Sequence, residues 1–134
     1  MSGSDRNEDG AEPARPSPDE PLSLRAAQAA VDAWIGRFEE GYWPPLVNLA
    51  RLTEEVGELA RLMNHRFGPK SKKPEEPEQE LALELADVLF VLLVIANEQG
   101  IDLDHALERT LAKYRARDAD RWTPREGGGT AAGG

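Results

Sequence analysis

The sequence predicts an all-α protein, and three observations lead to this prediction. Apolar residues recur at helical spacing through four segments between about residues 22 and 122. No stretch of any length shows the alternation of apolar and polar residues that is typical of a strand. Glycine and proline fall between the four segments, where helices end and connections begin. We therefore expect one domain built as a four-helix bundle over residues 22–123.

The first two helices are predicted on either side of an aromatic connection. One is expected from about Leu22 to Glu40, and its helically spaced apolar residues, Trp34 among them, are expected to form core. Gly41 ends it, and the segment GYWPP gives a stiff link. The second helix is expected from about Pro45 to Phe67. It carries one apolar stripe, made of Leu49, Leu52, Val56, Leu59, Ala60 and Met63.

The third and fourth helices follow a charged loop that contains three prolines, GPKSKKPEEPE. The third is expected from about Glu78 to Gln99 and is apolar all round from Leu85 to Ala96, which is typical of a helix enclosed by others. Asp102 is expected to cap the start of the fourth helix. About 100 ordered residues are too few to cover the third helix, so we expect a homodimer, with a dimer of dimers as the larger option.

Composition and charge exclude several classes of function. The net charge of −9 argues against binding a nucleic acid polymer, which requires clustered lysine and arginine. The chain has no cysteine, so it forms neither disulfides nor thiolate metal sites. The longest apolar run is too short to span a bilayer. Residues 1–21 and 124–134 are expected to be disordered tails, and the protein is expected to be cytoplasmic.

Two pairs of acidic residues are the most informative feature of the sequence. Glu55 and Glu58 share a face of the second helix, and Glu84 and Asp87 share a face of the third. In an antiparallel helical hairpin, facing residues have a nearly constant index sum. Glu55 with Asp87 and Glu58 with Glu84 have the same sum, and its midpoint, Ser71, falls in the predicted loop. The two pairs should therefore lie level with each other.

Four carboxylates in one place repel each other unless a cation holds them. A set of oxygen ligands suits Mg²⁺, with Mn²⁺ as a substitute. A di-iron site would require Glu-x-x-His pairs, whereas positions 61 and 87 are Arg and Asp. The alternative is that the glutamates form a solvated face paired with Arg51, Arg61 or Arg66.

The segments EEVGELA and ELADVLFVLLVIANEQGIDL resemble the MazG-like nucleotide pyrophosphohydrolases, whose signature is E-E-x-x-E followed by E-x-x-D. The flanking segments, including KYRARDADRW, are most similar to the short, single-domain YpjD-type members. The resemblance implies an all-α dimer or tetramer that uses Mg²⁺ to convert nucleoside triphosphates to monophosphates and pyrophosphate. It implies that Glu55, Glu58, Glu84 and Asp87 bind metal, and that Glu54, with Glu55, serves catalysis.

Six further residues are candidates for binding the nucleotide: Tyr42, Trp43, His65, Asn97, Lys113 and Arg117. Tyr42 and Trp43 could stack on a base, and the resemblance implies a phosphate contact near Lys113. Each of these residues could instead have a purely structural role. Lys113 and Arg117 could be present because cations are favoured near a helix C-terminus, and Asn97 could help to end its helix. The expected function is housecleaning hydrolysis of nucleotides. A non-catalytic helical dimer, serving as a regulatory or scaffold module, is the alternative.

Overall fold

The chain folds into four α-helices in a computed structural model that describes residues 19, 21–69 and 80–126. The helices are α1 (Leu24–Ile35), α2 (Pro45–Phe67), α3 (Leu81–Glu98) and α4 (Leu103–Asp118). Over these residues there is no strand, so the all-α prediction is confirmed. Most of both expected tails, and the loop around Ser71, lie outside the described residues.

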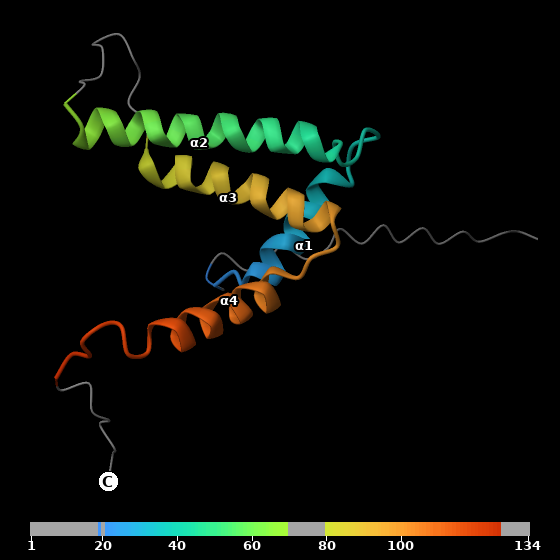
Figure 1. Ribbon diagram of the computed structural model, residues 1–134. Coiled ribbons are helices and arrows are strands. Elements are labelled where there is room, and N and C mark those ends of the chain that lie inside the picture. The colour runs from blue at the N-terminus through green and yellow to red at the C-terminus, as the bar shows by residue number, and fades with distance from the viewer. Residues whose placement is uncertain (1–18, 20, 70–79, 127–134) are drawn as a thin grey trace, which may run out of the picture.

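The helices α2 and α3 form the antiparallel hairpin on which the expected meeting of the acidic pairs depended (Figure 1). Helix α1 packs against α3 near the end of the hairpin, and α4 packs against α1. In Figure 1, α3 lies between α2 and α4, so α4 is on the side of α3 away from α2.

The helix boundaries follow from local capping. The Ser23 hydroxyl accepts a hydrogen bond from the Ala26 amide (3.1 Å) and starts α1. This helix ends at Ile35 rather than near Glu40, because Gly36 follows it and the chain then continues in turns. The predicted bounds of α2 are confirmed, with proline in its first turn.

The predicted cap of α4 is also confirmed. The Asp102 carboxylate accepts hydrogen bonds from the amides of Asp104 (3.0 Å) and His105 (3.3 Å). Gly100, between α3 and α4, has a φ of +67°, which a residue with a side chain rarely adopts. This glycine lets the chain leave α3 and enter α4 within a few residues.

The core is small and centres on α1 and α3. Val31, Leu93 and Val94 form its buried cluster, against which Ala27, Ile35, Tyr42, Phe90 and Leu103 pack. Trp34 was expected in this core, but it is 50% exposed. It makes an edge-to-face contact with Phe38, which is also exposed.

Two apolar stripes remain uncovered by this chain. On α2 the exposed residues include Leu49, Val56 and Met63, and on α3 they are Leu83, Leu85, Leu89 and Leu92. As expected, one chain does not cover α3 completely, because α2 and α1 pack against only part of its circumference. The apolar stripe of α2 is only partly covered, since Leu52 and Leu59 are half-buried.

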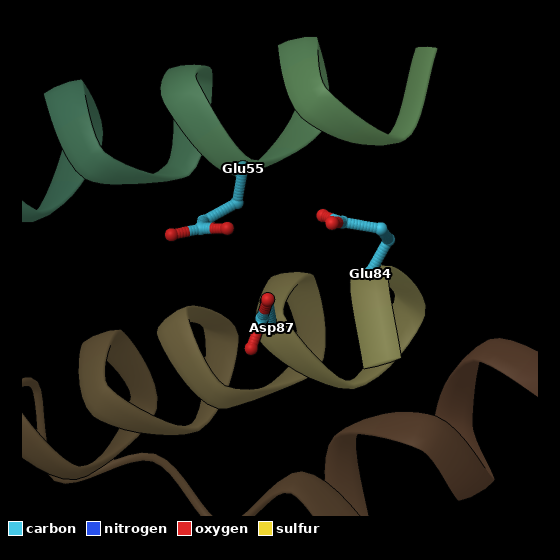
Figure 2. A group of neighbouring side chains, drawn as sticks. All are labelled: Glu55, Glu84 and Asp87. Carbon is cyan, nitrogen blue, oxygen red and sulfur yellow. The ribbon is translucent and has the colours of Figure 1, made fainter. Parts of the chain in front are cut away.

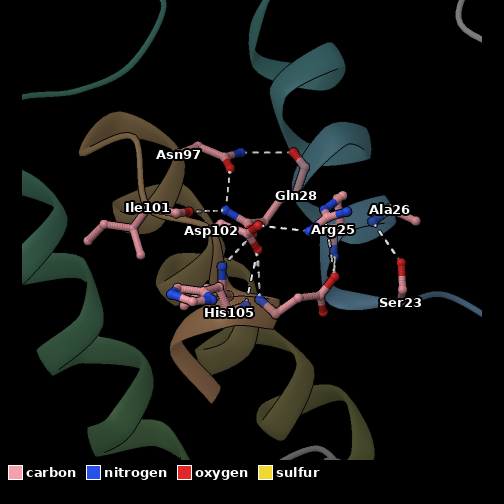
Figure 3. A network of polar contacts seen from close by, with 10 residues as sticks. Ser23, Arg25, Ala26, Gln28, Asn97, Ile101, Asp102 and His105 are labelled. Carbon is pink, nitrogen blue, oxygen red and sulfur yellow. Dashed lines mark hydrogen bonds and ion pairs between the residues drawn. The ribbon is translucent and has the colours of Figure 1, made fainter. Parts of the chain in front are cut away.

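A hydrogen-bond network ties α1 to the corner between α3 and α4 (Figure 3). The Gln28 side-chain amide donates to Asn97 Oδ1 (3.0 Å) and to the Ile101 carbonyl (2.7 Å), and its oxygen accepts from the Leu103 amide (3.0 Å). Asn97 Nδ2 in turn donates to the backbone carbonyl of Gln28 (2.9 Å). Because these bonds satisfy both side-chain amides, they hold α1, α3 and the start of α4 in fixed relation.

Among the described helices, each is either too short or too polar to cross a bilayer.

Candidate functional site

Three acidic side chains from α2 and α3 meet across the hairpin (Figure 2). Glu55 comes from α2, and Glu84 and Asp87 come from α3. One carboxylate oxygen from each lies within 4.8 Å of the others. The predicted register therefore brings three of the four expected acids together.

The fourth acid, Glu58, lies outside this group of three but close enough for its charge to act on it. The pKa of Glu84 is raised above its ordinary value, first by partial burial and then by the negative charges of Asp87, Glu58 and Glu55. Like charges at this spacing oppose the ionised form of Glu84. A bound cation would remove that opposition.

The burial of these acids differs from the expectation for Asp87. The sequence surrounds Asp87 with apolar residues, in a stretch of α3 that is expected to be enclosed by other helices. Instead Asp87 is exposed, while Glu55 and Glu84 are half-buried. Leu83, which precedes Asp87 by about one turn on the same face of α3, is also exposed, so this face is open at the start of the helix.

The acidic cluster fits a hard divalent cation. Its donors are carboxylate oxygens alone, which are the ligands that Mg²⁺ and Mn²⁺ prefer in proteins. Glu55, Glu84 and Asp87 could contribute directly, and Glu58 lies one turn along α2 from Glu55. The alternative in which Arg51 pairs with these glutamates finds no support, because its guanidinium lies over the ring of Trp43, 4.8 Å from the ring centroid.

A pocket of about 500 Å³ opens beside the acidic cluster, between the α1–α2 connection and the hairpin. Its walls include four aromatic residues of α1 and the connection, namely Trp34, Phe38, Tyr42 and Trp43. Arg51 of α2 and Phe90 of α3 also line it. Arg51 precedes Glu55 by one helical turn, and Phe90 follows Asp87 by about one turn, so the pocket and the acids lie along the same seam.

Two polar contacts hold the pocket wall. The Tyr42 hydroxyl donates to Asp32 Oδ1 (2.6 Å), and burial together with this bond raises the pKa of Tyr42 to about 12. Asn48 is only 1% exposed, and its side-chain amide donates to the Trp43 carbonyl (3.1 Å). The connection that carries Tyr42 and Trp43 is thus fixed to α1 at one residue and to α2 at the next.

The remaining candidates lie apart from the cluster or are engaged elsewhere. Asn97 bonds to Gln28. His65 is half-buried in the last turn of α2, and Glu54 is exposed beside Glu55. Lys113 and Arg117 lie on α4 against the ring of Tyr114, and α4 is on the far side of α3 from α2 (Figure 1). Within one chain, α4 therefore does not bring its cations to the acids.

Sequence reasoning did not identify Arg51, Asn48 or Phe38 as residues of a pocket, and it favoured a core position for Trp34 over stacking on a base. The available signal was the spacing of Asn48 and Arg51, which precede Glu55 by seven and four residues and therefore share its face of α2. Trp34 and Phe38 are also one turn apart, but their spacing matches a core stripe equally well.

Comparisons with known proteins show which proteins this chain is similar to. The model of the MazG nucleotide pyrophosphohydrolase domain matches residues 44–122. The uncharacterised protein YpjD of Bacillus subtilis (strain 168) is 50% identical over 106 residues, which cover 79% of this chain and 96% of YpjD. A dATP/dGTP diphosphohydrolase of cyanophage S-2L is 33% identical over 97 residues, which cover 72% of this chain and 78% of the phage protein.

A solved structure gives the same result for the fold. The crystal structure of the Bacillus-conserved MazG protein, a nucleotide pyrophosphohydrolase, is similar with a TM-score of 0.65 and 45% sequence identity. The match covers 76% of this chain and 99% of that one.

Proposed function

Because the chain belongs to the MazG nucleotide pyrophosphohydrolase family and is therefore a hydrolase, we propose that it converts (d)NTPs and water to (d)NMPs and pyrophosphate with Mg²⁺, cleaning the nucleotide pool. The observation that carries this proposal is the meeting of Glu55, Glu84 and Asp87 within 4.8 Å across the hairpin. Three carboxylates at that spacing are costly without a cation and suited to binding one.

We assign the metal-binding role to Glu55, Glu58, Glu84 and Asp87. A bound Mg²⁺ would neutralise triphosphate oxygens and lower the pKa of a bound water. Glu84 and Asp87 come from one helix and Glu55 and Glu58 from the other, so the packing of the hairpin sets their separation. The net charge of −9 is then compatible with an anionic substrate, because the cation lies between the acids and the phosphates.

In the proposed reaction, a water oxygen attacks the α-phosphorus, and the bond from that phosphorus to the bridging oxygen breaks. Pyrophosphate leaves with the bonding electrons, and the water proton passes to a carboxylate. Glu54 is our candidate for this base, since it is exposed beside Glu55 and is not one of the three clustered acids.

The aromatic pocket is our candidate site for the nucleoside. It begins about one helical turn, roughly 5.4 Å, from the acids along α2, so metal-bound phosphates would leave the sugar and base in it. Tyr42 and Trp43 are the residues we expect to contact the base. The similarity to a phage enzyme named for dATP and dGTP supports purine deoxynucleotides as substrates.

We also propose that a second copy of the chain covers the exposed stripes of α2 and α3. Leu85, Leu89 and Leu92 recur at helical spacing on α3, and a continuous apolar face of this kind marks an interaction surface. A second copy could also bring Lys113 and Arg117 to the phosphates, which α4 of the same chain does not do. A dimer of dimers would extend the same arrangement.

Light scattering on the purified protein tests the assembly. We expect a mass of at least twice the 14.7 kDa of one chain. The variant Leu92→Lys places a charge on the α3 stripe and should shift the mass toward that of one chain, whereas Glu108→Lys on α4 should leave it unchanged. A wild-type protein that is monomeric at micromolar concentrations would contradict the proposal.

The function is tested by incubating the protein with the common NTPs and dNTPs in Mg²⁺ and measuring pyrophosphate and monophosphate. We expect the two products in equal amounts from at least one nucleotide, and none after chelation of the metal. A folded protein that turns over no nucleotide would favour the alternative of a regulatory or scaffold module. Release of orthophosphate alone would refute the proposed bond cleavage.

A further inference from the structure

Arg51 is the one cationic residue that lines the aromatic pocket in the described part of the chain. It is half-buried, and its guanidinium lies 4.8 Å from the centroid of the Trp43 ring. A cation over an aromatic face is attracted to it and loses freedom of movement. Trp43 is itself held by the bond from Asn48 to its carbonyl. The guanidinium is therefore positioned before any ligand binds.

The orientation of Arg51 is not the one its position on the helix favours. Glu54 and Glu55 follow it by three and four residues, a spacing at which opposite charges commonly pair. Among the ion pairs of the described residues, none joins Arg51 to a carboxylate, and the guanidinium lies over Trp43 instead. Its hydrogen-bond donors thus stay available at the pocket rather than neutralising the metal-binding acids.

The place of Arg51 in the pocket indicates which part of a nucleotide it meets. The phosphates are expected one helical turn away, at the acids. Arg51 and Trp43 line the same pocket, and the guanidinium lies over the Trp43 ring, so a base that enters among the pocket's other aromatic residues would meet the guanidinium. A guanidinium donates two parallel hydrogen bonds, and guanine presents two adjacent acceptors, O6 and N7. Adenine presents N7 beside an amino group. This amino group is a hydrogen-bond donor, so it cannot accept the second hydrogen bond from the guanidinium.

We propose that Arg51 is a specificity-determining residue that binds O6 and N7 of a guanine base and so favours guanine over adenine nucleotides. The inference rests on the proposed function, since it concerns the base of the same substrate. Lysine cannot replace arginine in this role, because an ammonium group lacks the planar fork.

The test compares kcat/KM for dGTP, dITP, 7-deaza-dGTP and dATP between the wild type and Arg51→Ala. A good bidentate pair of hydrogen bonds favours the correct base over the wrong one by roughly five- to a hundredfold in affinity. We expect Arg51→Ala to lower kcat/KM for dGTP and dITP by that factor, mainly through KM, and to change dATP by less than about twofold. The wild type should already prefer dGTP to 7-deaza-dGTP, which lacks the N7 acceptor.

Two further variants make the result specific. Arg51→Lys keeps the charge and should still lose most of the preference for guanine. Arg37→Ala removes another arginine that lies over an aromatic ring, that of Trp34, but does not line the pocket, so the preference should persist. Equal losses on all four nucleotides would make Arg51 a phosphate contact, and unchanged ratios would remove it from recognition; either result overturns the inference.

Calorimetry of dGMP and dAMP binding in Mg²⁺ separates this inference from the proposed function. If the wild type binds dGMP more tightly than dAMP and Arg51→Ala loses that difference, base reading by Arg51 stands even for a protein without turnover. If the wild type releases pyrophosphate but binds both monophosphates equally, only the inference about Arg51 fails.

Discussion

Replacing Asp87 by asparagine is expected to reduce Mg²⁺-dependent pyrophosphate release by at least about a hundredfold while the fold stays intact. Mutation of residues that merely orient metal ligands already lowers metal affinity or activity by about 10–100-fold, so mutation of a ligand itself should lower activity by at least as much. Asparagine has nearly the same shape but no charge. Because Asp87 is exposed and lies among like charges, the change removes repulsion and little packing.

The matched control for Asp87→Asn is Glu108→Gln, which neutralises an exposed acid on α4 away from the cluster. It should retain the wild-type rate. Circular dichroism should show the same helix content for both variants, so that a loss of activity reports the site and not unfolding. Normal hydrolysis by Asp87→Asn would mean that this residue is not a metal ligand.

Millimolar Mg²⁺ is expected to raise the thermal midpoint of the wild-type protein at neutral pH. A ligand at a hundred times its Kd stabilises a fold by about 2.7 kcal/mol. For a domain of this size that corresponds to a rise of roughly ten degrees or more. Glu84→Gln should abolish most of this rise and should melt higher than the wild type without metal, because it removes a charge that Asp87, Glu58 and Glu55 oppose.

Both the stability of the metal-free protein and the stabilisation by Mg²⁺ should depend on pH. The pKa of Glu84 is raised in the folded protein, so between the ordinary and the raised value the folded state binds more protons than the unfolded chain. The metal-free protein should therefore gain stability as the pH falls through that range. The rise due to Mg²⁺ should shrink over the same range, since proton and metal compete for the carboxylate. An equal Mg²⁺ effect in Glu84→Gln would disprove the assignment.

The meeting of the acids was predictable because it depends on simple quantities. One loop joins α2 and α3, so they pack antiparallel, and residue numbers then give the level at which Glu55 meets Asp87. The ends of α2 and the cap at Asp102 were predictable because Pro45, Gly68 and Asp102 act through the local backbone. Such features need no knowledge of distant contacts.

The exposure of individual residues was not predictable in the same way. Apolar spacing on α2 identified the stripe through Leu49, Val56 and Met63, yet the chain buries Asn48 and Leu62 on another face. Spacing shows that a face is apolar but not which neighbour covers it, and a second copy is a neighbour that the sequence does not display. Arg51 was missed because its role depends on the fold of the α1–α2 connection, which brings Trp43 under its guanidinium.

The central claim is that the carboxylates shared by α2 and α3 hold the cation on which hydrolysis depends. It is tested most directly by measuring pyrophosphate release from a dNTP across a Mg²⁺ titration, with wild type and Asp87→Asn side by side. We predict saturable release by the wild type and release near the no-enzyme rate by Asp87→Asn at every Mg²⁺ concentration. Matching curves for the two proteins, or release by the wild type that persists in a chelator, would contradict the claim.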